Sequence, residues 1–176
     1  MHEPGVRVRR TDRYAYDHGP VERRSLSHGV LRVDSTCPDV VVGFCNASYR
    51  VAVPDNVLVR LRVADGNVRI TAINSSVDVT TGAGSINMEA WCGHTLDAVT
   101  KSGAVRASAD CIPEVMNART DSGDVSLTVP AAGYRLVAHS ADGKVTVTGI
   151  ADVDSSEWSL QALSNSGNVR VEGEGS

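Results

Sequence analysis

The stretch that decides the fold runs from Leu96 to Leu127 and reads LDAVTKSGAVRASADCIPEVMNARTDSGDVSL. It contains one pattern twice: alternating apolar residues, a Ser-Gly pair, and alternating apolar residues again. Alternation with a period of two is typical of β-strands, whose successive side chains point to opposite faces. Glycine adopts positive φ angles without steric cost, and a preceding Ser or Asp can hydrogen-bond the local backbone. Each copy is therefore predicted to be a strand, a tight turn and a second strand.

The same pattern, with Ser, Asp or Ala before the glycine, occurs six times along the chain. The other four copies are VRLRVADGNVRI (59–70), VDVTTGAGSINM (77–88), LVAHSADGKVTV (136–147) and LQALSNSGNVRV (160–171). The turn glycines, at spacings of 18, 19, 20, 20 and 24 residues, are Gly66, Gly84, Gly103, Gly123, Gly143 and Gly167. A turn that recurs at such regular intervals favours a coiled path in which each unit stacks on the one before.

A single unit of this size is not expected to fold alone. It has about four inward aliphatic side chains, each worth roughly 1.5–3 kcal/mol when buried, whereas ordering the backbone opposes folding by about 1–2 kcal/mol per residue. Stacked coils share a continuous core and pair their backbones. The sequence therefore predicts an all-β fold, a single-stranded β-solenoid or β-helix of coils of about 20 residues with Ser-Gly or Asp-Gly turns. The positions two residues after each glycine are predicted to be interior: Val68, Ile86, Val105, Val125, Val145 and Val169.

Composition and charge set the limits of the remaining predictions. The 176 residues are 41% hydrophobic with a net charge of −4, which disfavours a nucleic-acid partner. No apolar run approaches the ~18–20 residues of a membrane span, and MHEPGVRVRR at the start lacks the apolar core of a signal peptide. Residues 1–20 are predicted to be a tail or linker with an edge strand near 6–10. Residues 21–176 are predicted to form the solenoid domain, with an irregular first coil at about 25–53 and repeats over about 54–173.

The first 36 residues have a different charge from the rest of the chain. They hold seven arginines and five carboxylates, a net charge of +2, which leaves −6 for the remainder. This charge asymmetry has two interpretations. The N-terminal end lies near an anionic membrane surface, or it is a solvated face without a partner.

The cysteines test the repeat independently. Cys92 and Cys111 each lie eight residues after a turn glycine, so they occupy the same position in consecutive coils. Vertical neighbours in such a stack are about 4.7–4.9 Å apart, within the Cα window of roughly 4.4–6.8 Å for a disulfide. Cys37 and Cys45 are eight residues apart, a separation that allows a short closed loop. Two such pairs indicate an oxidising compartment, the alternative being buried, reduced cysteines in a cytosolic protein.

Candidate catalytic and metal-binding residues form no recognisable motif. The cysteines and histidines lack the spacing of a zinc site. None of the five histidines shares a metal-ligand or nucleophile motif with another. They are His2, His18, His28, His94 and His139. The acidic residues that flank the turn glycines are Asp65, Asp121, Asp124 and Asp142. They lack the patterns of an EF-hand or a nine-residue calcium repeat and are interpreted as turn-stabilising. No catalytic residue, cofactor or metal ion is therefore predicted.

Three segments carry a resemblance to a known family: CPDVVVGFCNASYRVAVPDNVLVRLRVADGNVRI (37–70), EAWCGHTLDAVTKSGAVRAS (89–108) and MNARTDSGDVSLTVP (116–130). Over about residues 25–173 the chain resembles the bacterial adhesin-like family of β-strand repeats with "toast-rack" domains. Its paired cysteines and the Cys-Gly segment before Leu96 resemble an actinobacterial branch. The resemblance implies a stacked β domain displayed outside the cytoplasmic membrane, without established catalytic residues. Relatives often carry an N-terminal membrane helix, which this sequence lacks.

The sequence thus favours a non-enzymatic, envelope-exposed interaction or scaffold module. Its partner would be an unidentified protein or cell-surface component, and open solenoid ends would allow self-association. The first alternative is a cytosolic scaffold whose stacked strands polymerise. The second is a carbohydrate-active β-helix enzyme, which would need a cleft with several acids on one face.

Overall fold

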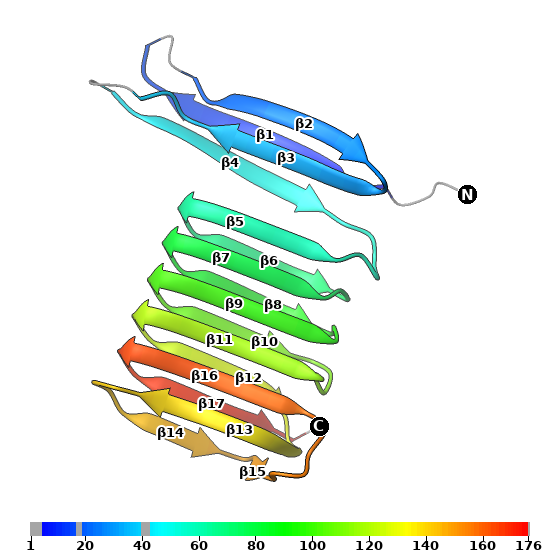
Figure 1. The fold of residues 1–176 in the computed structure, drawn as a ribbon, viewed down its shortest axis with the longest axis vertical. Helices are drawn as coiled ribbons and strands as arrows, with labels where there is room; N and C mark the ends of the chain where they lie inside the picture. The colour runs from blue at the N-terminus through cyan, green and yellow to red at the C-terminus, as the bar shows by residue number, and fades with distance from the viewer. Residues whose placement is uncertain (1–4, 17–18, 40–42, 176) are drawn as a thin grey trace. The chain divides into compact units, whose positions relative to one another are not determined.

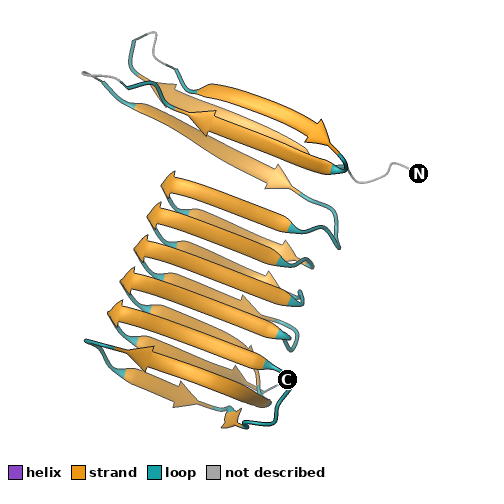
Figure 2. Ribbon diagram, in the orientation of Figure 1, coloured by secondary structure: helices purple, strands orange, loops and turns teal. Residues whose placement is uncertain are grey.

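The computed structural model describes residues 5–16, 19–39 and 43–175, and these residues form strands and turns without a helix (Figure 2). The chain divides into two compact units, Met1–Pro54 and Asp55–Ser176. The predicted all-β fold is confirmed, because the second unit is a β-solenoid of six coils.

Each coil of the second unit contributes one strand to each of two parallel sheets, and Figure 1 shows the strands stacked as rungs. One sheet has seven strands: β5 (Val59–Asp65), β7 (Val77–Ala83), β9 (Thr95–Ser102), β11 (Val115–Ser122), β13 (Gly133–Ser140), β15 (Ala151–Asp152) and β16 (Ser159–Ser166). The other has six: β6 (Val68–Ile73), β8 (Ile86–Trp91), β10 (Val105–Ala109), β12 (Val125–Pro130), β14 (Val145–Thr148) and β17 (Val169–Glu174). The repeat found in the sequence therefore corresponds to one coil.

The order of the coils differs from the expectation that each stacks on the one before. The seven-stranded sheet runs β5-β7-β9-β11-β16-β13-β15, and the six-stranded sheet runs β6-β8-β10-β12-β17-β14. The sixth repeat in sequence is thus inserted between the fourth and the fifth, as Figure 1 shows for β16 and β17. The fifth repeat becomes the terminal coil of the stack.

The length of one connection makes this inserted order possible. Ten residues, 149–158, separate β14 from β16, whereas only residues 131 and 132 separate β12 from β13. The long connection first adds β15 beside β13, where Ala151 aligns with Gly133. It then returns the chain one level into the stack, where Ser159 N–H bonds to the carbonyl of Glu114 at 2.9 Å. The spacing of 24 residues before the last glycine thus corresponds to a return crossing.

The interior of the stack is formed by vertical rows of aliphatic side chains. Five of the six predicted interior residues are buried, with exposed fractions of 8% at Val68 and 0–1% at the other four: Ile86, Val105, Val125 and Val169. The prediction is wrong for Val145, which is 38% exposed. Its coil ends the stack, so no further coil covers its inward side chains.

The first unit pairs its strands in the antiparallel direction. β1 (Arg7–Tyr14) pairs with β4 (Cys45–Ala52), and β2 (Val21–Ser27) pairs with β3 (Val30–Thr36). This arrangement differs from the predicted tail at 1–20, because β1 extends to Tyr14 and pairs along its whole length.

The hairpin and the pairing of β4 also differ from the predicted irregular coil at 25–53. His28 and Gly29, both at positive φ (51° and 76°), form the two-residue turn between β2 and β3. Two positive φ angles match a type I′ hairpin turn, which suits the twist of antiparallel strands. Alternation alone does not reveal strand direction, so the same apolar pattern fits a coil or a hairpin.

Candidate interaction surface

The turn glycines form one column along the stack. Every turn glycine except Gly66 lies directly over the carbonyl of the glycine one level away, and a Cβ on Gly103 would meet the Gly84 carbonyl oxygen at 2.3 Å. The same contact repeats up the column, where a Cβ on Gly167 would lie 2.0 Å from the Gly123 oxygen. Gly143 follows over Gly167, as the inserted coil order requires. Close backbone approach therefore selects glycine throughout the column except at Gly66, where the nearest atom is 3.4 Å away.

A hydroxyl three residues before five of the six turn glycines bonds to the glycine carbonyl of the adjacent coil. These residues donate at 2.6–3.2 Å: Thr81 to Gly66, Thr100 to Gly84, Thr120 to Gly103, Ser164 to Gly123 and Ser140 to Gly167. We call this set the hydroxyl ladder. The first coil has Val63 at this position, and no coil of the second unit precedes it with a carbonyl to satisfy. The Thr/Ser in the repeat is thus an interior hydrogen-bond donor.

The residues that flank the glycines make a second set of contacts between coils. The Asp124 carboxylate accepts a hydrogen bond from Asn168 N–H at 2.7 Å, and the Asn168 side-chain oxygen accepts one from Lys144 N–H at 3.1 Å. Asp121 similarly accepts from the side-chain amide of Asn165 at 3.2 Å. These contacts give Asp121 and Asp124 a structural role in satisfying backbone and amide donors.

Residues with metal-binding or catalytic potential are dispersed over the described chain. Within residues 5–16, 19–39 and 43–175, no three His, Cys, Asp or Glu side chains gather as a metal site. His94 Nδ1 lies 3.0 Å from Glu114 Oε1, in an exposed pair. His28 is in the β2–β3 turn and His139 is opposite Leu163 on the seven-stranded sheet, while His2 and His18 fall outside the described residues.

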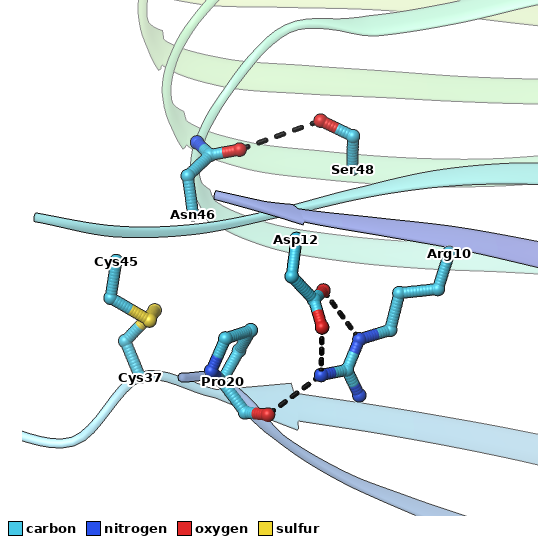
Figure 3. Close-up of a disulfide and its surroundings, with 7 residues drawn as sticks. All are labelled: Arg10, Asp12, Pro20, Cys37, Cys45, Asn46 and Ser48. Carbon is cyan, nitrogen blue, oxygen red and sulfur yellow. Dashed lines mark hydrogen bonds and ion pairs between the residues drawn. A yellow bond between two sulfur atoms is a disulfide. The ribbon is translucent and has the colours of Figure 1, made fainter. Parts of the chain in front are cut away.

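All four cysteines are paired as the sequence analysis expected. Cys92 and Cys111 join adjacent coils, with Cα atoms 5.0 Å apart. Cys37 and Cys45 close a loop in the first unit, with Cα atoms 5.8 Å apart. Figure 3 shows this second disulfide near the Arg10–Asp12 ion pair and the Pro20 carbonyl, which accepts from Arg10 at 2.7 Å.

The outer side of the six-stranded sheet carries a continuous polar surface. Its central part, which we call the polar face, comprises outward residues of β8, β10 and β12: Asn87, Glu89, Arg106, Ser108, Ser126 and Thr128. Asn87, Arg106 and Ser126 align in one row across the sheet. The six residues of the polar face line a shallow, open depression of about 240 Å³. Enclosed small-molecule sites usually occupy about 300–1,000 Å³, so this shape suits contact with a larger surface.

The outer side of the seven-stranded sheet holds a pair of adjacent carboxylates. Asp78 and Asp97 align on β7 and β9, and Arg60 bonds to Asp78 at 2.8 Å. The pKa of Asp97 is raised above its ordinary value of 3.8. Partial desolvation is the larger cause, and the negative charge of Asp78 is the smaller one. These carboxylates lie on the opposite sheet from the depression, whose lining contains one carboxylate, Glu89. The two features therefore do not combine into an acidic cleft.

Sequence reasoning did not single out the polar face. Its residues are the outward members of the alternation, and their types vary from coil to coil. The available signal was the set of small polar residues, such as Ser126 and Thr128, between buried ones.

The parallel stacked strands, the glycine column and the hydroxyl ladder place the second unit in the class of β-solenoid repeat proteins. The model of the Toastrack DUF4097 family matches residues 56–172, two thirds of the chain. The chain therefore belongs to this family of β-solenoid domains, whose function is unknown. Searches of curated proteins and of solved structures found no match. None of the described residues forms a helix with the length and hydropathy needed to cross a bilayer.

Proposed function

We propose that this protein is a non-catalytic interaction module that works outside the cytoplasm, as an adhesin-like or scaffold domain of the cell envelope. The observation that carries the proposal is the pairing of all four cysteines, Cys37 with Cys45 and Cys92 with Cys111. Structural disulfides persist in oxidising compartments and are rare in the cytosol. Both pairs join parts of the chain that the fold already brings together, as in a stably oxidised protein.

The compartment is tested by trapping thiols in intact cells of the native host with a membrane-permeant alkylating reagent. The proposal expects all four cysteines to escape alkylation until a reductant is added after denaturation. Peptide mapping without reduction should recover the Cys37–Cys45 and Cys92–Cys111 links. Four alkylated cysteines in native cells would instead support the cytosolic scaffold.

The polar face is the surface proposed to contact the partner. Three neighbouring strands present Asn87, Arg106 and Ser126 in one row, so hydrogen-bonding groups recur at the strand spacing of about 4.8 Å. The side chains stand on a stack whose inward residues are buried, which limits the entropy lost when a partner binds. A rigid, polar and nearly flat surface suits a macromolecular partner.

Site-specific cross-linking in whole cells tests this surface. A photoreactive residue at Ser126 should form an adduct with a cell-surface component. The matched control is Asn117, which is also half-buried and points outward from the other sheet. Adducts from both positions, or from neither, would contradict the polar face as the contact surface.

The terminal coil supports a second candidate, a scaffold that self-associates through its end. Val145 and Val147 of β14 are 38% and 39% exposed although they belong to interior rows. β14 is also the last strand of its sheet, so one side of its backbone is not paired within the sheet. Exposed apolar edges of this kind promote strand addition from another chain.

Sedimentation of the full chain over a range of concentrations tests this second candidate. The scaffold expects concentration-dependent association that Val145→Lys/Val147→Lys removes. The control Thr71→Lys/Thr80→Lys adds the same two positive charges at exposed outward positions of the stack and should leave association unchanged. A monomer at all concentrations would exclude the self-associating scaffold while leaving the interaction module intact.

A further inference from the structure

One face of the β1–β4 ribbon in the first unit is strongly basic. Alternation along β1 places Arg7, Arg9 and Arg13 on the same side, and the register with β4 adds Arg50. All four are exposed. The other members of the face are Thr11, Asn46, Ser48 and Ala52, so it carries four positive charges and no acidic residue. We call it the basic face.

On the opposite side of the same ribbon, one arginine is held by contacts within the protein. Arg10 bonds to the carboxylate of Asp12 and to the Pro20 carbonyl, and lies 3.6 Å from Glu22. Figure 3 shows Arg10 and Asp12 on one side of the ribbon and Asn46 and Ser48 on the other. Among the described residues, no carboxylate lies within 4.0 Å of any arginine of the basic face.

The cross-strand register makes this face unfavourable for folding. Arg9 lies directly opposite Arg50, and like charges at directly opposite positions destabilise a strand pair. A sequence that specifies its fold well breaks such a local rule mainly where a function requires it. The basic face therefore calls for a partner that supplies negative charge.

We propose that the basic face docks the protein on a bilayer surface containing anionic phospholipids. The arginines span about 20 Å along β1, given a rise of about 3.4 Å per residue, and Arg50 extends the charge across to β4. All four project from one side of a two-stranded ribbon, an arrangement that matches a plane of phosphates. The guanidinium group binds phosphate with paired N–H donors and is weakly hydrated, so arginine suits this contact.

The expected strength follows from the charge count. A basic side chain close to an anionic leaflet contributes about fivefold to the partition coefficient, equivalent to about 1 kcal/mol. Removing three arginines should therefore weaken vesicle binding by about 100-fold. Binding should also fall steeply with added salt, because the screening length shortens to about 3 Å at 1 M.

The test is co-sedimentation of the full, oxidised chain with vesicles of phosphatidylcholine that contain roughly one-third phosphatidylglycerol. Arg7→Ala/Arg9→Ala/Arg13→Ala should lose about 100-fold in binding. The matched control, Arg62→Ala/Arg69→Ala/Arg135→Ala, removes the same charge from exposed positions of the stack outside the polar face and should retain binding. Arg→Lys replacement at positions 7, 9 and 13 should retain most of the binding, because it keeps the charge.

Hydrogen exchange over residues 5–54 keeps the test interpretable. Arg9→Ala relieves the repulsion with Arg50, so it should preserve or raise protection of β1 while weakening binding. Equal loss in the two triple variants, equal binding to pure phosphatidylcholine, or wild-type binding by Arg7→Ala/Arg9→Ala/Arg13→Ala would overturn the proposal. Soluble polyphosphate that binds when anionic vesicles do not would also overturn it, in favour of a soluble polyanion.

Discussion

The first unit and the stack use different physical means to stay folded. All the buried hydrophobic residues of the described chain lie in the stack, from Val68 to Val171. In the first unit Val21, Leu26 and Val30 are more than half exposed, and order depends on strand pairing, ion pairs around Arg10 and one disulfide. The two units are both β-structure, yet only the stack has the continuous core that makes a repeat fold stable.

This difference shows what repetition contributes to stability. In the stack, an inward side chain of one coil contacts equivalent side chains of the coils on either side, so each added coil buries more apolar surface. In the first unit the strands form two-stranded sheets, and an isolated two-stranded hairpin is marginal in water. Removing the same kind of interaction from the two units should therefore have unequal consequences.

The largest expected difference concerns the disulfides. In the chain-entropy model the Cys37–Cys45 loop is worth about 2.5 kcal/mol and the Cys92–Cys111 loop about 3 kcal/mol. Cys37→Ser/Cys45→Ser should nevertheless abolish most hydrogen-exchange protection in residues 5–54, because that unit has little buried apolar surface to compensate. Cys92→Ser/Cys111→Ser should lower the melting temperature of the stack and leave its strands protected. Unchanged protection of β1 and β4 in the first variant would show that the comparison is wrong.

The glycine column gives the next largest effect. Gly103→Ala places a Cβ 2.3 Å from the Gly84 carbonyl oxygen, whereas Gly66→Ala meets only the Val63 side chain at 3.4 Å. The two positions share nearly the same φ, 141° and 147°, so both variants carry the same backbone strain. The clash should make Gly103→Ala about 2 kcal/mol more destabilising than Gly66→Ala in urea unfolding. Equal losses would mean that backbone conformation alone selects glycine.

A smaller effect is expected in the hydroxyl ladder. Thr120→Val keeps the shape of the side chain but removes its hydrogen bond to the Gly103 carbonyl, at 2.9 Å in the native protein. A buried acceptor without its donor should lower the free energy of unfolding by about 1–2 kcal/mol. Thr120→Ser keeps the hydroxyl and serves as the control for the loss of the methyl group. If the valine variant is as stable as the wild type, the ladder contributes nothing beyond packing.

The smallest expected effect is that acidification changes the stability of the two units in opposite directions. Hydrogen bonds from Arg10 and Arg24 hold the pKa of Asp12 and of Glu22 below their ordinary values of 3.8 and 4.5. Their stabilisation is present above those values and is lost as the pH falls through the lower pKa of the folded state. Burial and Asp78 raise the pKa of Asp97, so its destabilisation is present above that raised pKa and is relieved as the pH falls towards 3.8.

Acidification below about pH 4.5 should therefore weaken the first unit while the Asp97 contribution to the stack improves. Hydrogen exchange at several pH values, resolved by segment, measures both changes in one experiment. Asp97→Asn should stabilise the stack at pH 7 and remove the contribution of residue 97 to the pH dependence of its stability. Loss of stability in Asp97→Asn at pH 7 would contradict the assigned cause.

Much of the stack was predictable because its determinants are local and repeated. The glycine column and the Cys92–Cys111 link followed from counting residues between equivalent positions, since equivalent positions in a solenoid are vertical neighbours. Even Val63 is informative in retrospect, because it replaces the hydroxyl in the coil that has no preceding glycine carbonyl to satisfy. The polar face was not predictable, since it depends on which outward side chains lie side by side across three coils.

The first unit was harder to predict for a different reason. The alternation of arginines in RVRRTDR (7–13) is visible in the sequence, but the pairing of Arg9 with Arg50 depends on the antiparallel partner of β1. That partner lies about 40 residues further along the chain. Antiparallel pairing between distant segments has no fixed spacing that a repeat count could reveal.

The sequence by itself determined the coil, its turn chemistry and the inward positions, because each depends on a period of two around a glycine. Only the tertiary structure decided the order of the last two coils. Their inward residues are nearly the same, with Leu136, Ala138 and Val147 in the fifth repeat matched by Leu160, Ala162 and Val171 in the sixth. Two coils with the same interior fit either level locally. The choice of the terminal coil therefore rests on the crossing at 149–158 and on the contacts it makes.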